Sequence, residues 1–245
     1  MLLWGKTDGN VKAIIGVSGL PFTGVARNPD IKRIKDCGPH DRIAVPTAPV
    51  DPGHYVRHRA AEAYRDDKAN GKLVPNQVQL GHPDALTALL HRQHEVTSHL
   101  ASWPFQEIEL KSPGIHVVVR SREALGGEDV LRWPTAPPSS ARRILGGAFF
   151  AAYEEAVGMI KKDPKAAAAN LSMVKEHATA EEIVRLLTQP RPIYRAEPVR
   201  AMVYAEYMAK TGFIKPTPTS WKDHFSPLFD REGAERAIAP SLYIA

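Results

Sequence analysis

Residues 78–105, VQLGHPDALTALLHRQHEVTSHLASWPF, alternate short extended runs with a helical segment. The helix is predicted to begin at His82-Pro83-Asp84, since proline suits the first turn of a helix, where its missing N–H is not needed. Its apolar face has helical spacing and consists of Leu86, Leu89 and Leu90. A second extended run covers residues 96–100 and ends before Pro104, which cannot continue a central strand.

The same alternation continues on both sides of this stretch. Strands are predicted at residues 11–16, 20–26, 42–45 and 115–120, and helices at 54–64, 149–161, from Asp163-Pro164 onward, after Thr179 and at 198–210. The helix after Thr179 is headed by a capping box, because Glu182 stands three residues after the threonine. Strands that alternate with helices favour an α/β fold with parallel βαβ units.

Composition excludes several classes of function. The 245 residues carry a net charge of +5, but the basic side chains are scattered rather than clustered, which argues against nucleic-acid binding. Cys37 is the only cysteine, so one chain holds neither a disulfide nor a CxxC metal site. The sequence contains no run of 18 apolar residues, so no membrane span is predicted. The N-terminus does not have the pattern of a secretory signal.

Motifs for catalysis or metal binding are weak. Four histidines fall within residues 82–99, and His91 and His94 share a helix face, but a metal site needs three or four converging ligands, so no metal and no cofactor are predicted. Cys37 stands near His40, too close in sequence to imply a catalytic pair. The sequence contains no phosphate-binding glycine motif.

The run HPDALTALL…EVTSHLASWPFQEIEL resembles the central segment of periplasmic solute-binding proteins of the nitrate/sulfonate/taurine type, a group with thiamine-pyrimidine-precursor-like members. The flanking stretches VKAIIGVSGLPF, NPDIKRIKD, RIAVP and MAKTGFIKPTPTSWKDHFSP agree with it in order. The resemblance implies an α/β, two-lobed periplasmic-binding architecture of type II. Because the chain begins at LLWGKTDGNVK, the first lobe is expected to be incomplete.

The resemblance also implies domains and a site. The first lobe is expected to comprise residues 1–29 and 114–245, and the second lobe residues 30–113. Residues in the cleft between lobes are expected to bind a small organic solute, and those assigned here are Ser18, Thr47, Asp51, His99, Ser102 and Trp103. The anionic Asp51 weakens the case for an inorganic anion. The implied partner is an ABC transporter permease, and the implied location is the periplasm.

Two alternatives remain open at this stage. One is an enzyme of the same fold, such as a desulfinase-like hydrolase that uses Cys37 or His99. The other is a truncated, non-functional product. Turnover of an aryl sulfinate would favour the enzyme, and saturable binding without turnover would favour the solute-binding protein.

Overall fold

The structure is a computed structural model, and it describes residues 2–14, 16, 18–20, 22–46, 72–91, 95–120, 130–132, 135–136, 140–170, 179–188, 194, 201–210, 212–215 and 217–225. The chain forms two compact units. Unit 1 comprises Met1–Gly19 and Val130–Ala245, and unit 2 comprises Leu20–Asp129.

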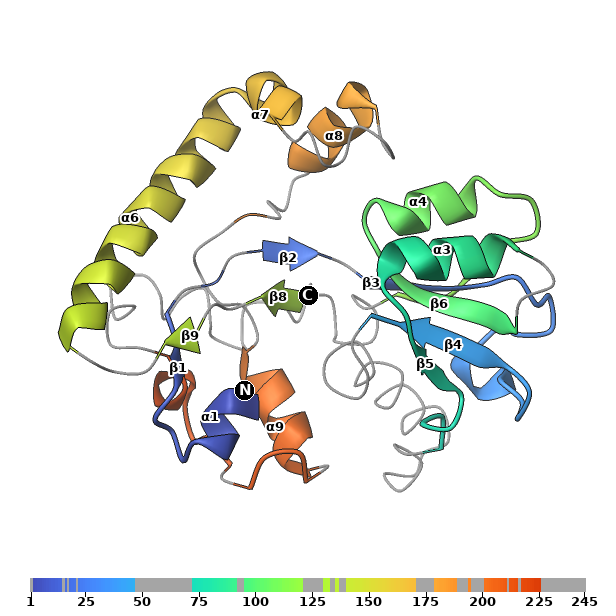
Figure 1. Cartoon of the computed structure of the whole chain (residues 1–245), viewed down its shortest axis with the longest axis horizontal. Helices are drawn as coiled ribbons and strands as arrows, with labels where there is room; N and C mark the ends of the chain where they lie inside the picture. The colour runs from blue at the N-terminus through green and yellow to red at the C-terminus, as the bar shows by residue number, and fades with distance from the viewer. Residues whose placement is uncertain are drawn as a thin grey trace, which may run out of the picture. The chain divides into compact units, whose positions relative to one another are not determined.

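Unit 2 is built on a five-stranded mixed sheet in the order β5-β4-β6-β3-β7 (Figure 1). Its strands are β3 (Phe22–Ala26), β4 (Arg42–Val45), β5 (Gln77–Gln79), β6 (Val96–Ser102) and β7 (His116–Arg120). Strand β4 lies parallel to β5 and β6, whereas β3 runs antiparallel to both β6 and β7. A 3₁₀ turn, η1 (Ile34–Asp36), precedes β4.

Two helices of unit 2 lie against this sheet, α3 (His82–Leu90) and α4 (Phe105–Leu110) (Figure 1). The core beneath α3 consists of buried aliphatic side chains from the helix and three strands, namely Val25, Ala44, Ala85, Ala88, Leu89 and Val96. Strands β3 and β7 approach closely at Gly24, where an added Cβ would meet Val119 Cγ1 at 2.6 Å. Burial of this apolar surface supplies the main driving force for unit 2.

Unit 1 is mostly helical in its described part. Its helices are α1 (Leu2–Lys6), α6 (Ser140–Lys162), α7 (Pro164–Asn170), α8 (Ala180–Leu187), α9 (Ala201–Lys210) and the 3₁₀ turn η4 (Trp221–Asp223). Two short strand pairs are also present, β1 (Lys12–Ala13) with β9 (Thr135–Ala136), and β2 (Ser18–Leu20) with β8 (Val130–Arg132). A small core of Trp4, Met208 and Ile214 joins α1 to α9.

Several local predictions are confirmed. The helix at His82, the strand at residues 42–45 and the capping box of Thr179 and Glu182 all occur as predicted. The helix expected at 54–64 lies outside the described residues. In the part of the chain that is described, no helix is long and apolar enough to cross a membrane.

Two predictions about strands need correction. Of the described residues among 11–16, only Lys12–Ala13 form a strand. The sheet of unit 2 is mixed and not wholly parallel, because the antiparallel strands β3 and β7 extend it. The two compact units divide at 19/20 and 129/130, whereas the expected lobes divide at 29/30 and 113/114, and that assignment of lobes stays a prediction.

Candidate functional site

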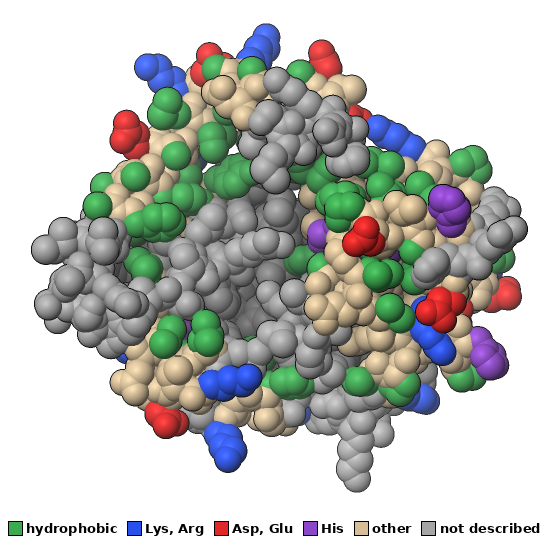
Figure 2. Space-filling view, viewed as in Figure 1, with side chains coloured by type: hydrophobic (Ala, Val, Ile, Leu, Met, Phe, Trp, Pro, Cys, Tyr) green, Lys and Arg blue, Asp and Glu red, His purple; other side chains and the backbone are tan. Residues whose placement is uncertain are grey.

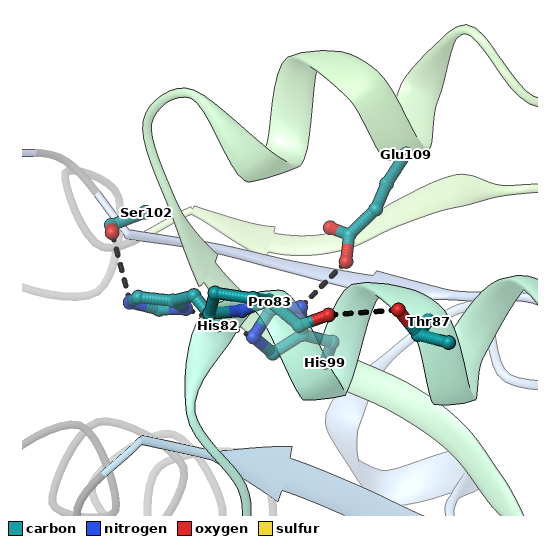
Figure 3. A network of polar contacts seen from close by, with 6 residues as sticks. All are labelled: His82, Pro83, Thr87, His99, Ser102 and Glu109. Carbon is teal, nitrogen blue, oxygen red and sulfur yellow. Dashed lines mark hydrogen bonds and ion pairs between the residues drawn. The ribbon is translucent and has the colours of Figure 1, made fainter. Parts of the chain in front are cut away.

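Four side chains of unit 2 form a continuous chain of hydrogen bonds, which we call the relay: Ser102, His82, His99 and Glu109 (Figure 3). Ser102 Oγ lies 2.9 Å from His82 Nε2, and His82 Nδ1 lies 3.0 Å from His99 Nε2. His99 Nδ1 lies 2.6 Å from Glu109 Oε1. Each distance is within normal hydrogen-bond range.

The topology of unit 2 brings these groups to one edge of the sheet. Strands β5 and β6 both lie parallel to β4, so their carboxyl ends meet at the same edge. His82 begins α3 shortly after β5 ends, and Ser102 is the last residue of β6. The chain then turns through the cis Trp103–Pro104 bond into α4, which carries Glu109 back over β6. This is the edge at which open α/β sheets bind ligands.

The inner half of the relay is fully enclosed. His99 and Glu109 are both 0% exposed. A carboxylate and an imidazole are stable at such a position only when they are paired, and the bond between His99 Nδ1 and Glu109 Oε1 supplies that pairing. Low surrounding polarity strengthens the bond.

The outer half of the relay is bounded by aromatic rings. The His82 ring stacks on Phe105, with centroids 5.2 Å apart and an interplanar angle of 20°. Phe22 lies 6.3 Å from the same ring. The helix turn that bears His82 is fixed further by Thr87 Oγ1, which donates to the Pro83 carbonyl at 3.0 Å (Figure 3). The result is a hydroxyl that is 4% exposed and a partly exposed imidazole, both held in fixed orientation beside aromatic side chains.

The structure places the residues predicted from sequence unequally. His99 and Ser102 belong to the relay, and Trp103 follows it directly as a partly buried residue of the turn. Ser18 lies in β2, but its side chain is outside the described part, as are Thr47 and Asp51 altogether. Ligand contact by these six residues stays a prediction.

Sequence reasoning missed His82 and Glu109 as members of the site. The sequence suggests His82 only as one of four clustered histidines, so the placement of His82 at a helix start and His99 on a strand gave no sign of a hydrogen bond between them. Glu109 gave no signal, because α4 itself was not predicted. A buried glutamate in a short helix after a strand is visible only once the sheet is known.

Cys37 does not look like a nucleophile in this environment. Burial, with smaller contributions from the nearby charges of Asp41 and Asp36, raises the pKa of its thiol to about 12. The thiol therefore stays protonated at neutral pH, and only the thiolate is an effective nucleophile.

No metal cluster is found where the structure describes the chain: no three histidine, cysteine or acidic side chains converge there. His91 is exposed and its Nδ1 lies 3.1 Å from the Thr87 carbonyl, whereas His94 is outside the described residues. Charged side chains on the face shown in Figure 2 are scattered, with no basic stripe among the described residues in view.

Comparison with known proteins gives structural similarity only. No family model and no curated protein matches the sequence. The periplasmic aliphatic sulphonate binding protein of Escherichia coli matches with a TM-score of 0.61 at 15% identity, over 92% of this chain and 72% of that one. The alkanesulfonate-binding protein of Xanthomonas axonopodis pv. citri, bound to MOPS, gives 0.59 at 13% identity, over 87% and 73%.

A third solved structure belongs to an import system. The ligand-binding component of an ABC-type import system from Staphylococcus aureus, with zinc bound, gives a TM-score of 0.54 at 12% identity, over 92% of this chain and 76% of that one. These structural matches establish the α/β fold of periplasmic-binding proteins for this chain. All three neighbours are ligand-binding proteins, and the third belongs to an ABC-type import system.

Proposed function

We propose that this chain binds a small organic anion of the sulfonate class in the periplasm and delivers it to the permease of an ABC importer. The observation that carries the proposal is the shared fold: solved binding proteins of such importers match 87–92% of the chain. A shared fold alone does not fix a ligand, so the choice of ligand class rests on the site.

The site at the end of β6 suits an organic anion. Ser102 offers a hydroxyl, which is a hydrogen-bonding partner for a sulfonate or carboxylate oxygen, and the His82 ring holds that hydroxyl in a fixed orientation. Phe105 and Phe22 lie beside the His82 ring and supply apolar surface for the carbon part of the ligand. Trp103 is proposed as a further ligand contact, with Ser18 and Thr47, whereas the Asp51 carboxylate would repel an anion and is not counted among the contacts.

A binding role is favoured over the desulfinase-like alternative. The hydrolase would need an ionised Cys37 thiol, and burial opposes ionisation. His99 is fully buried and its two ring nitrogens face His82 and Glu109, so it has no nitrogen left for a substrate. Because both nitrogens of His99 bond to other side chains of the chain, His99 is suited to holding His82 and Glu109 in position.

The test is a thermal-shift screen followed by calorimetry on the purified chain. The ligands are alkanesulfonates, MOPS, taurine, nitrate and aromatic carboxylates, since a ligand that binds only the native state raises its melting temperature. We expect an alkanesulfonate to bind, and Ser102→Ala to weaken it about tenfold, as expected for the loss of one hydrogen bond of about 1.5 kcal/mol to a charged group.

Ser98→Ala is the matched control. Ser98 lies in the same strand, is buried, and its hydroxyl has no hydrogen-bond partner among the described residues. We expect its ligand affinity to equal that of the unmodified chain. Failure of every sulfonate to bind, or hydrolysis of an aryl sulfinate by the purified chain, would contradict the proposed function.

A further inference from the structure

The relay restricts where its protons can stand. It contains three hydrogen bonds, and each needs one proton between its two atoms. Two chemical limits apply: Ser102 keeps its hydroxyl proton near neutral pH, and an imidazole ring keeps at least one of its two protons. Together these limits leave two kinds of arrangement.

In the first kind Ser102 donates its proton inward to His82 Nε2. His82 must then carry its own proton on Nδ1 and donate it to His99 Nε2. His99 in turn must donate from Nδ1 to Glu109 Oε1, and Glu109 is ionised, because a proton on its buried Oε2 would have no acceptor among the described residues. The relay holds three protons, and Ser102 presents only lone pairs to anything outside the relay.

In the second kind His82 carries a proton on Nε2 and donates it to Ser102 Oγ. The hydroxyl proton of Ser102 then points away from the relay. This arrangement holds four protons wherever the additional one resides, on the His82 ring, on the His99 ring or on Glu109. The outward face of Ser102 therefore changes from acceptor to donor when the relay gains one proton.

This change decides which ligand the site accepts. A sulfonate or carboxylate oxygen accepts hydrogen bonds and cannot donate them, so it pairs with Ser102 only in the four-proton arrangement. In the three-proton arrangement the lone pairs of Ser102 face those of the anion, and the relay has one positive charge fewer. Binding of an anion consequently draws one proton into the relay.

The other titratable groups that the structure describes around the relay do not provide this proton. Strand β3 has no titratable side chain, and Arg42 of β4 donates its guanidinium hydrogens to the carbonyls of Pro39 and Asp41. Asp84 of α3 and Glu107 of α4 are exposed to solvent. Cys37 lines a cavity together with His99 and is uncharged, because its thiol stays protonated.

We infer that the relay couples capture of an anion at Ser102 to the uptake of one proton. The identity of the ligand rests on the proposed function, whereas the two proton arrangements follow from the geometry of unit 2 alone. The Ser102 hydroxyl donates a hydrogen bond to a ligand at low pH and can only accept one at high pH. At pH values where the ligand-free relay holds three protons, each bound anion takes up one proton. The dissociation constant of the anion therefore rises about tenfold for each unit by which the pH increases.

The first measurement needs no ligand. The full chain, labelled with ¹⁵N at histidine, is titrated by NMR between about pH 5 and pH 9, the range in which histidine changes charge. We expect His82 Nε2 to be unprotonated and Nδ1 protonated at high pH, and Nε2 to gain a proton as the pH falls. His116 is the internal reference, because its Nε2 lies 2.8 Å from the Ile31 carbonyl and must keep its proton throughout.

The second measurement is calorimetry with propane-1-sulfonate, whose charge is constant over this range, in buffers of different ionisation enthalpy. At the high end we expect uptake of about one proton per bound sulfonate, and at the low end uptake of none. Ser102→Ala should remove the uptake, whereas Ser98→Ala should retain it. Glu109→Gln, which keeps an acceptor for His99 Nδ1 but removes the charge, should move the break in the affinity profile to lower pH.

The outcomes separate this inference from the proposed function. A His82 Nε2 that keeps its proton across the range, or sulfonate binding without proton uptake at any pH, overturns the coupling and leaves the binding function in place. Absence of sulfonate binding at every pH overturns the proposed function and the coupling with it. A Glu109→Gln profile identical to that of the unmodified chain also contradicts the relay.

Discussion

Two histidines are buried almost equally, one in each unit, and they differ in their polar contacts. His99 of unit 2 is 0% exposed, and both ring nitrogens lie within hydrogen-bond distance of relay partners. His224 of unit 1 is 2% exposed, and neither nitrogen has a hydrogen-bond partner among the described residues. Its ring lies instead against Trp4 and Phe225, with centroids 6.1 Å and 5.1 Å away.

The difference shows that burial alone does not decide whether a histidine has polar contacts. Burial lowers the pKa of His224 to about 4, with Asp223 opposing the shift, so this ring is neutral near pH 7 and serves as a core residue. His99 is equally enclosed but connects a buried carboxylate to a ring that is partly exposed. Of the two histidines, only His99 can therefore transmit a change of protonation between the partly exposed His82 ring and the buried Glu109.

The largest effect on stability is expected when His99, at the centre of the relay, is replaced. His99→Leu leaves Glu109 buried without its donor, and breaking a buried pair in this way typically costs about 3–5 kcal/mol of unfolding free energy. The double variant His99→Leu/Glu109→Leu, which removes both partners, should recover most of the loss. Urea unfolding of the two variants measures the difference, and equal losses in both would contradict a paired His99 and Glu109.

A smaller, pH-dependent effect is expected at His224. The unfolded ring takes up a proton below its ordinary pKa of 6.5, whereas the folded ring resists protonation down to about 4. Stability from this residue is therefore complete above pH 6.5 and is lost as the pH falls toward 4, by about 3 kcal/mol in all.

His224→Phe should remove that part of the pH dependence. Urea unfolding midpoints on both sides of the interval measure it, with the exposed His40→Gln as the control that should retain the slope of the unmodified chain. The same slope in His224→Phe as in the control would show that other groups cause the acid sensitivity.

No effect is expected from chelators in either unit. His99 and His82 use ring nitrogens in the relay, and the rings around His224 enclose it, so neither offers a site to zinc. Melting temperatures with and without EDTA should therefore agree. A drop of several degrees that added zinc restores would mean that a metal is bound by the chain.

Local structure was largely predictable from the sequence. The helix at His82 follows from proline in its first turn and the spacing of its leucines, and α8 follows from the capping box of Thr179 and Glu182. Helix α4 was missed because its six residues, FQEIEL, are too short for a helical period to stand out. The strand expected at 11–16 was overestimated, because an apolar run alone does not say whether a neighbouring strand is available to pair.

By itself the sequence determined most of the elements, because caps, proline positions and apolar periods act between residues within one or two turns of each other. It also singled out His99 and Ser102, two of the four relay residues. Only the tertiary structure decided that β3 and β7 join the sheet of unit 2 and that His82 and Glu109 meet His99. Those partners stand 17 and 10 residues away in sequence, and they meet only because strand pairing and the return of α3 and α4 over β6 bring distant residues together.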